Sequence, residues 1–372
     1  MTRLRAPARR RLLPGVVMAL LLAALLVLGA AVAQDGAPSE AVPDATPETA
    51  PQTAGETDDE APEASDLERR VITIDSSGGS QSGNLRYGPI VYQHPDPYGI
   101  VATVSTLTIF GPRAELSAPD DTLLSRSKGE RTARFTGGVR VVRGRLEATG
   151  PALVYREATG LGELAGAADA NDATDGGADA ATGGGVDVVI APDEEGDDPT
   201  LISATLAEFD VDTDRSVNRG DVVLVAGSQR AEADVLTYAE DTDLALLDCD
   251  GLCTIVREDE ENGLLTITAR EIRVLTQDER LWARGDVTVV DGDLVTRGDE
   301  AVYDDAQKIA EVTGSPARSV NEADGVTLES DRILQDVEFD YVEAIDASVV
   351  SDLDLTAFLF AEEREAGGPS TP

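Results

Sequence analysis

Few residues of this chain have the types and spacing that catalysis needs. The sole histidine, His94, lies in residues 93–97, where two prolines indicate a surface turn rather than a catalytic group. Residues 79–83 resemble the nucleophile elbow of hydrolases, but Gln81 occupies the central position that this motif reserves for serine. The sequence also contains no glycine loop of the kind that cradles phosphates. We therefore expect a protein that is not an enzyme and has no cofactor.

One run of oxygen-bearing side chains has a spacing that suits calcium. The EF-hand loop, however, needs glycine at its sixth position, where Arg215 stands, and a bidentate glutamate that is also missing. The run aligns with residues 277–279 of a later repeat, which read as a hairpin turn. We predict a turn and no metal site, with calcium as the weaker alternative. The run comprises Asp210, Asp212, Asp214, Ser216, Asn218 and Asp221.

The two cysteines, Cys249 and Cys253, are separated by Asp-Gly-Leu. In an oxidising compartment, a close pair that flanks a turn is expected to form a disulfide across a tight loop. Two cysteines and one distant histidine do not supply the four ligands of a tetrahedral zinc site unless carboxylates complete it. We predict a disulfide here and no metal centre.

The N-terminus has the features of an export signal. Residues 1–33 begin with five arginines, continue into an apolar run and end in Ala31-Val32-Ala33, a pattern that signal peptidase accepts. An uncleaved inner-membrane anchor is the alternative, because about twenty apolar residues can span a bilayer. We expect the protein to be periplasmic.

The chain is strongly acidic, with 30 basic and 71 acidic residues and a net charge of −41. Residues 1–33 hold five arginines and no acidic residue, so their removal would leave 25 basic residues against 71 acidic ones, a net charge of −46. Such a chain repels nucleic acids and anionic membrane surfaces. Solubility in a saline habitat and binding of divalent cations are two explanations of this acidity.

Low-complexity composition separates the parts that can fold. Residues 34–66 read as a disordered acidic linker, residues 166–199 as a disordered Ala/Asp/Gly-rich insertion and residues 351–372 as a flexible tail, since such compositions bury too little apolar surface. Between them, residues 67–165 and 200–350 contain short alternating runs rich in Val, Ile and Thr, bounded by Gly, Asp and Asn. This period of two predicts strands and an all-β fold.

An internal repeat organises these strands. Each copy has a glycine, a valine two residues later, a small residue eleven after the valine and a tyrosine sixteen after it. The first copy has Gly137, Val139, Gly150 and Tyr155; the second has Gly220, Val222, Ala233 and Tyr238; the third has Gly285, Val287, Gly298 and Tyr303. Residues 67–165 hold the first copy and a degenerate earlier one, and residues 200–350 hold the second, the third and a half copy.

Apolar residues upstream of the glycine change phase within each copy. Ile202 and Ala204 alternate on one face, but the next apolar residues, Ala207 and Phe209, are displaced by three. Such a step predicts a bulge or a bend at a corner of the sheet. Stacked copies would form a continuous sheet with open edges that can accept another strand.

Residues 282–305 and 312–317 resemble the OstA-like repeat of the lipopolysaccharide-transport periplasmic protein family. Residues 219–238 are similar to it, and residues 137–155 are more loosely so. The resemblance implies an elongated, open β-jellyroll, V-shaped or taco-like, whose apolar trough holds acyl chains and whose units join end to end. A direct contact with an anionic glycolipid would need bridging divalent cations or a basic patch, and arginines cluster within residues 126–145.

The resemblance thus implies a role in transport of lipopolysaccharide or another glycolipid to the outer membrane, in association with other OstA-like proteins or further copies of the chain. A structural envelope scaffold without a lipid ligand is the alternative, in which core packing alone explains the apolar residues. A calcium-stabilised surface adhesin is a third and weaker possibility. The residues expected to line the trough are Val139, Val141, Val222, Leu224, Val287, Val289, Tyr155, Tyr238 and Tyr303.

Overall fold

The alternation of apolar and polar side chains produces strands with one buried face. In β13 (Arg215–Ala226), every second residue on each side of the bend at Gly220 is buried, and the residues between them are at least partly exposed. The computed structural model describes residues 68–166, 185–194, 196–259, 263–338, 341–345 and 355–366, all within the unit Glu60–Pro372. The expected signal at residues 1–33 and linker at 34–66 lie outside the described residues.

The described part of the chain is almost entirely β-structure. Strands of its first portion are β1 (Thr73–Asp75), β2 (Ser80–Gly83), β3 (Ile90–Gln93), β4 (Ile100–Val104), β5 (Leu107–Gly111), β6 (Arg113–Ser117), β7 (Thr132–Arg143), β8 (Leu146–Arg156), β9 (Leu161–Ala165) and β10 (Val186–Ile190). They are followed by β11 (Thr200–Ala204), β12 (Leu206–Asp210), β13, β14 (Gln229–Ala239), β15 (Leu244–Asp259), β16 (Gly263–Leu275), β17 (Arg280–Asp291), β18 (Leu294–Asp304), β19 (Ile309–Asn321), β20 (Thr327–Asp336) and β21 (Tyr341–Ile345). A 3-10 helix η1 (Leu355–Phe358) and a short helix α3 (Ala361–Glu365) follow. The prediction of an all-β, jellyroll-like fold is confirmed.

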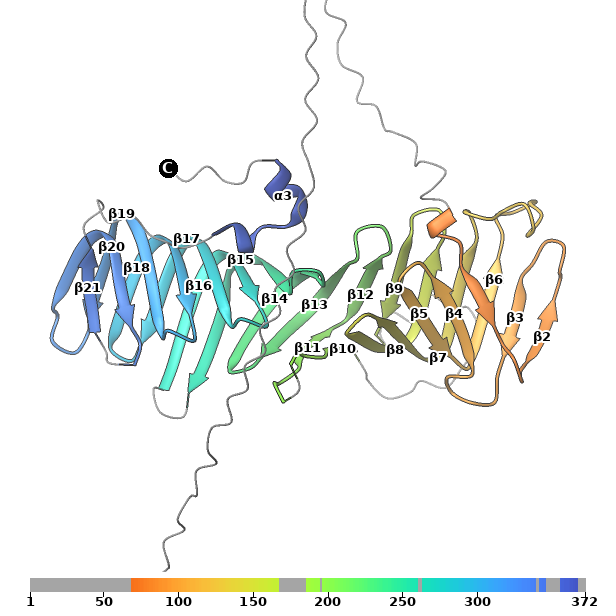
Figure 1. The fold of residues 1–372 in the computed structure, drawn as a ribbon, viewed down its shortest axis with the longest axis horizontal. Coiled ribbons are helices and arrows are strands. Elements are labelled where there is room, and N and C mark those ends of the chain that lie inside the picture. The colour runs from red at the N-terminus through yellow and green to blue at the C-terminus, as the bar shows by residue number, and fades with distance from the viewer. Residues whose placement is uncertain are drawn as a thin grey trace, which may run out of the picture. The chain divides into compact units, whose positions relative to one another are not determined.

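All pairings are antiparallel, and they divide the sheet into two leaves. Leaf A contains the short strands β1, β4, β5, β10 and β11, and leaf B contains β2, β3, β6, β9, β12 and β21. The long strands β7, β8 and β13–β20 run through both, with one half in each leaf. Figure 1 shows the strands following one another from β2 and β3 at one end of the unit to β20 and β21 at the other.

The two leaves meet at a corner, where the long strands shift register. In β7, β13 and β17 the shift comes just before Val139, Val222 and Val287, respectively. Two successive residues there have a positive φ, which bends the strand as a bulge does and which glycine adopts without steric cost. The pairs are Gly137 and Gly138, Gly220 and Asp221, and Gly285 and Asp286.

The small residue of each copy is the direct cross-strand partner of its valine. Val139 lies opposite Gly150, Val222 opposite Ala233 and Val287 opposite Gly298. A Cβ on Gly298 would lie 2.4 Å from the carbonyl oxygen of Thr313. The corner therefore brings the next strand so close that a large side chain does not fit at this position.

The change of phase in the apolar pattern also coincides with this corner. In the second copy, leaf A strand β11 ends at Ala204 and leaf B strand β12 begins at Leu206. In the third copy, the single strand β16 shifts register between Thr268 and Glu271. Ile202, Ala204, Ala207 and Phe209 are all buried in one core, so the predicted bend is confirmed.

Cys249 and Cys253 form the expected disulfide, with an S–S distance of 2.06 Å. The bridge closes the corner of β15, whose register shifts between Asp248 and Cys253. The amide of Asp250 within this loop donates a hydrogen bond of 2.6 Å to the Asp234 carboxylate.

Two expected low-complexity segments contain regular structure. Residues 186–190 of the expected insertion form β10, which fills leaf A between β8 and β11, because Val186, Val188 and Ile190 alternate and are buried. Residues 167–184 lie outside the described part.

No helix among the described residues is long and apolar enough to cross a membrane.

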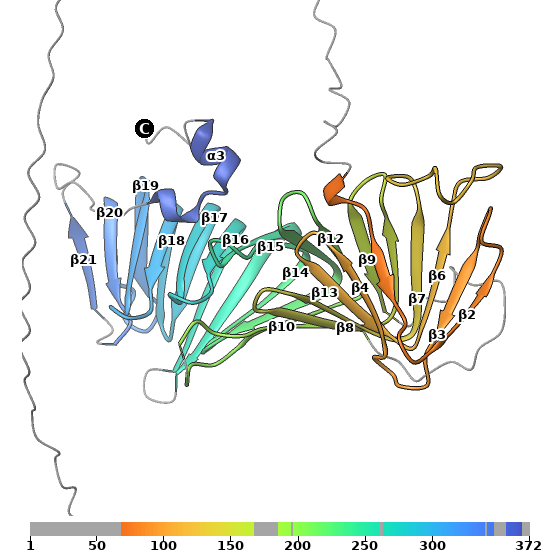
Figure 2. The ribbon, with the colours of Figure 1, turned by 45° about the vertical axis from the view of Figure 1, so that its right-hand side comes forward.

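The prediction of a flexible tail at residues 351–372 is also wrong for residues 355–366. These residues dock on the outer face of leaf B. Phe358, Leu359 and Phe360 are buried against a second apolar cluster that includes Leu275 and Trp282. The Arg273 guanidinium fixes this segment by donating to the Phe358 carbonyl oxygen at 2.9 Å and to both carboxylate oxygens of Glu363. Both views place α3 beside β15–β17 (Figures 1 and 2).

Candidate functional site

The inner face of leaf A carries a continuous apolar row along successive strands. Each member is the cross-strand neighbour of the next, and all are buried. The row consists of Ala102, Ile109, Val141, Ala148, Val188, Ile202, Leu224, Ala231, Ile255, Ile267 and Val289. After it the row becomes polar at Thr296 and Ser319, whose hydroxyl groups hydrogen-bond to each other at 2.9 Å.

A matching row follows the inner face of leaf B. It consists of Ala114, Phe135, Leu153, Leu164, Ala207, Asn218, Leu236, Leu247, Ile272, Ala283, Ala301, Val312 and Ile333. All thirteen side chains are buried, and Asn218 is the one polar member. The two rows belong to the same core cluster, so leaves A and B enclose a shared apolar interior.

The structure brings the nine residues expected to line a trough into this one core cluster. The six aliphatic residues face inward from leaf A, near the corner or one row further from it. The tyrosines instead mark the far ends of leaf B strands, where each hydroxyl donates to a neighbouring turn or to the N-terminal segment. Tyr155 donates to the Arg70 carbonyl oxygen at 2.7 Å, Tyr238 to Asp243 at 2.5 Å and Tyr303 to Asp305 at 2.7 Å. Burial is the main cause that raises the pKa of Tyr155 and of Tyr238. Both hydroxyl groups therefore stay protonated and can donate hydrogen bonds.

The interior is tightly filled. Between the leaves, the space lined by Ile255, Leu265 and Ile267 of leaf A and by Leu281 and Tyr303 of leaf B is too narrow to admit a water molecule. A channel that accommodates an acyl chain beside these side chains therefore requires leaves A and B to move apart.

The side of the interior opposite the corner is where the hairpin turns of leaf A face those of leaf B, and we call it the mouth. Arg143, at the β7–β8 turn of leaf A, donates to Glu240 on a leaf B turn at 2.5 Å and to the Asp210 carbonyl oxygen at 2.9 Å. Arg145 of the same turn donates to both carboxylate oxygens of Asp243, at 2.7 and 2.8 Å.

Further contacts cross the mouth on either side of these arginines. Thr106 donates to Asp214 at 2.7 Å, and the Gln229 amide donates to the Glu279 carbonyl oxygen at 2.8 Å. Arg257 forms an ion pair with Asp305. The inner face thus has apolar rows near the corner and in the middle, and a row of paired polar groups at the mouth.

The N-terminal segment crosses the first part of the mouth. Ile72 precedes β1 of leaf A, yet its amide donates to Glu157 beyond the end of leaf B strand β8, at 2.9 Å. The wholly buried Glu157 also pairs with Arg131 at 2.5 Å, and Arg131 donates to the Ile72 carbonyl oxygen. Arg70 pairs with Asp212 at 2.5 Å.

Burial contributes to the pKa shift of each of three carboxylates at the mouth. Desolvation raises the pKa of Glu240, and the Arg143 charge only partly opposes this effect. Desolvation and a hydrogen bond with Asp305 raise the pKa of Glu279. Desolvation also acts on Asp305, but hydrogen bonds from Tyr303 and Lys308 and the Arg257 charge outweigh it and lower the pKa of this group.

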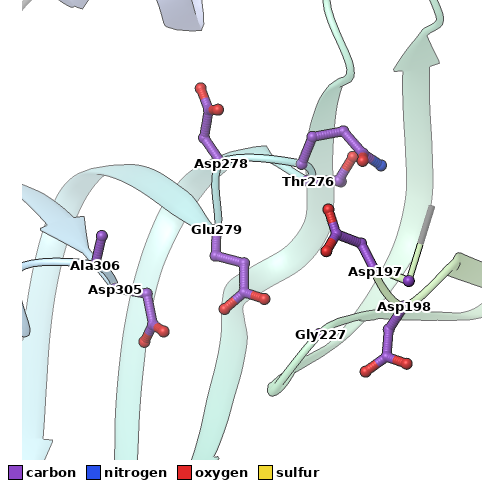
Figure 3. Close-up of a pocket in the computed structure, with 10 residues that line it drawn as sticks. Asp197, Asp198, Gly227, Thr276, Asp278, Glu279, Asp305 and Ala306 are labelled. Atoms are coloured by element: carbon purple, nitrogen blue, oxygen red, sulfur yellow. The ribbon is translucent and has the colours of Figure 1, made fainter. Parts of the chain in front are cut away.

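An acidic depression of about 420 Å³ lies beside this pair on the outside of the mouth. Figure 3 shows Glu279 and Asp305 on one side of it and Asp197 and Asp198 on the other, next to Gly227. Among the described residues, no group of three or more histidine, cysteine or acidic side chains is arranged to hold a metal ion.

The run with calcium-like spacing is divided between a turn and a strand. Asp210 ends β12, and Asp212 and Asp214 belong to the β12–β13 turn, as expected, where Arg70 and Thr106 engage them. Ser216 and Asn218 instead point into the interior from β13, away from the exposed Asp221. His94 lies in the turn between β3 and β4, where its Nδ1 accepts a 3.1 Å hydrogen bond from the Asp96 amide.

Sequence reasoning did not find the mouth residues, because they come from turns that are far apart in the chain. It did contain a signal for Ser216 and Asn218. The equivalent residues are Ala133 and Phe135 in the first copy and Leu281 and Ala283 in the third, so only the second copy is polar at these inward positions.

No family model matches the sequence, and no curated protein matches it. Among solved structures, the chain is similar to the crystal structure of LptH from Pseudomonas aeruginosa, the LptA homologous periplasmic component of the conserved lipopolysaccharide transport device. The match has 16% sequence identity and a TM-score of 0.28, and it covers 40% of this chain and 84% of that chain.

Proposed function

We propose that this protein is a non-enzymatic periplasmic protein that holds lipid acyl chains between leaves A and B. In this role it takes part in transport of lipopolysaccharide or another glycolipid to the outer membrane. The observation that carries the proposal is the gradient across the inner face. Apolar rows extend over many successive strands near the corner, and paired polar groups line the mouth. Such a gradient fits a molecule with apolar chains and a polar head.

The energetics allow the closed interior to open for such a ligand. Burial of a methylene contributes about 0.8 kcal/mol, so a chain of about ten methylenes gains roughly 8 kcal/mol. Partly exposed ion pairs such as Arg145–Asp243 contribute about 1 kcal/mol or less each. Acyl-chain burial can therefore offset the loss of several contacts across the mouth, provided that the corner stays intact.

The open edges of the sheet support the second element of the proposal, which is association with other envelope proteins. Among the described strands, β21 pairs only with β20, and β2 pairs only with β3. Their outer N–H and C=O groups can add a strand from a similar protein or from a second copy of this chain. A lipid could then pass between interiors that are aligned end to end.

Site-specific crosslinking in the native envelope tests lipid binding. A small diazirine amino acid at Leu224 or Val289 faces the interior, whereas the same group at Val223 or Thr288 lies on the other face of the same strand. We expect lipid adducts from the two interior positions and few from the two control positions. Interior probes that capture no lipid in a folded protein would refute the proposal.

The tight packing of the interior favours a second candidate, a scaffold that works through its edges alone. In that case the leaves never part, and probes at Leu224 capture only protein. Probes on the edge strand β21 would then capture partner proteins in both cases, so the interior position is the one that separates the two functions. Mass spectrometry of lipid that co-purifies with the protein gives an independent measurement.

A further inference from the structure

Three polar side chains are buried in the otherwise apolar interior beneath the mouth. Asn218 and Ser216 are both 0% exposed, and among the described residues neither the Asn218 amide nor the Ser216 hydroxyl has a hydrogen-bond partner. The guanidinium of Arg143 is also buried, and within the described part of the chain its Nη2 has no partner although Nε and Nη1 do. Buried polar groups without partners cost free energy and are rare in folded proteins.

Phe209 links the positions of these groups in the two leaves. The Arg143 guanidinium is 5.9 Å from the centre of the Phe209 ring. Phe209 is the direct cross-strand neighbour of Ser216, and Asn218 follows Ser216 on the same inner face of β13. Arg143 therefore approaches from leaf A the part of leaf B where Ser216 and Asn218 interrupt the apolar rows.

The position is specific to the second copy. The first copy has Ala133 and Phe135 in these two rows, and the third has Leu281 and Ala283. An apolar pair is thus compatible with the fold at this place, and packing alone does not require a serine and an asparagine.

We propose that Arg143, Ser216 and Asn218 form a subsite for the carbonyl end of an acyl chain, as an ester or amide. The subsite rests on the proposed lipid-binding function and deepens it. Its free groups are mainly donors, namely the Arg143 Nη2, the Asn218 amide nitrogen and the Ser216 hydroxyl, which match an acceptor oxygen. A neutral oxygen fits better than an anion, because the Glu240 carboxylate already balances the Arg143 charge.

This geometry gives the chain a defined orientation. The carbonyl lies beneath the mouth, where the polar head can remain near Arg145 and the turns of leaf B. The hydrocarbon part then extends along the apolar rows, over buried residues such as Leu224 of leaf A and Leu236 of leaf B.

Binding of two matched probes to the exported chain tests the subsite. One probe is a fluorescent twelve-carbon methyl ester, and the other is an alkane of the same length with the same fluorophore and no carbonyl. We expect the wild-type protein to prefer the ester. Asn218→Leu should lower the affinity for the ester roughly tenfold, the effect of about one buried hydrogen bond, and leave the affinity for the alkane unchanged.

Gln335→Leu is the matched control. Gln335 is another wholly buried amide with no partner among the residues that the structure describes, but it lies on β20, seven strands further along the sheet. We expect this variant to keep the preference for the ester. Circular dichroism should show that both variants fold, and Ser216→Ala provides a second test of the subsite if Asn218→Leu does not fold.

The outcomes separate the subsite from the function on which it rests. If Asn218→Leu and Ser216→Ala fold and retain the full preference for the ester, the subsite is refuted. Water molecules would then be the hydrogen-bond partners of these polar groups. If the wild-type protein binds neither probe, lipid binding itself is refuted.

Discussion

Arg143 and Glu240 lie 2.5 Å apart across the mouth, on hairpin turns that belong to different leaves. Their side chains are 3% and 17% exposed, so this contact is the most deeply buried of the ion pairs that involve the β7–β8 turn. It joins the first portion of the sheet to the second, since Arg143 ends β7 and Glu240 follows β14. The pair thus closes the mouth between these two turns.

The raised pKa of Glu240 predicts a pH dependence of stability. Because burial places the folded-state pKa above the usual value, the contribution of this group to stability is present below the unfolded pKa and is lost as pH rises through the folded pKa. We expect the melting temperature to fall between about pH 4.5 and neutrality, and Glu240→Gln to make this fall smaller. Glu232→Gln, at an exposed carboxylate on the same sheet, is the control and should leave the slope unchanged. Equal slopes for all three proteins would contradict the assignment to Glu240.

Enlarging the small residue at the corner should destabilise the fold. Gly298→Val places a branched side chain where a Cβ would already lie 2.4 Å from the Thr313 carbonyl oxygen and 2.6 Å from Cγ1 of Val312. Overpacking of this kind costs about 1–3 kcal/mol, which urea unfolding can measure. Arg297→Val adds the same side chain at the exposed neighbouring position and should change stability little. A Gly298→Val protein as stable as the Arg297→Val protein would show that the corner is not closely packed.

The docked C-terminal segment can be followed through the sole tryptophan. Trp282 is 2% exposed, and its ring centre is 6.3 Å from that of Phe358. Phe358→Ala should weaken docking of η1 and α3, shift the Trp282 emission to longer wavelength and increase its quenching by acrylamide. Glu365→Ala, at an exposed position of α3, should leave both signals unchanged. An unaltered spectrum in Phe358→Ala would argue that the segment does not cover Trp282 in solution.

The ion pair that holds the N-terminal segment should contribute far more to stability than a similar pair on the surface. Glu157 is wholly buried and accepts from Arg131 and from the amides of Ile72 and Gly129. Glu157→Gln leaves the Arg131 charge buried without its counter-charge, which is expected to cost about 3–5 kcal/mol.

The control for this variant is the exposed pair formed by Arg140 and Glu147 at 2.7 Å. Glu147→Gln should cost about 1 kcal/mol or less. Chemical denaturation of both variants measures the difference, and similar losses in the two proteins would show that the contact with Ile72 does not clamp the N-terminal segment.

The sequence by itself determined the local structure of this protein. Alternation predicts strands because side chains on a strand point to opposite faces in turn. The glycine two residues before each repeated valine marks the corner, since two successive residues with positive φ are needed there. The phase shift between Ala204 and Ala207 predicts the same bend, and Cys249 and Cys253 are close enough in the chain for their disulfide to be expected.

Tertiary structure decided the features that depend on pairing between distant residues. No local pattern shows that Arg143 would reach Glu240 or that Glu157 would hold Ile72, because such contacts arise only when two leaves face each other. Composition predicts a flexible tail at residues 351–372 for the same reason, since Phe358, Leu359 and Phe360 gain stability only from the cluster around Trp282. Asn218 illustrates both levels. Its polar character is visible in the sequence, but its burial among apolar neighbours follows from the register of β12, β13 and β14.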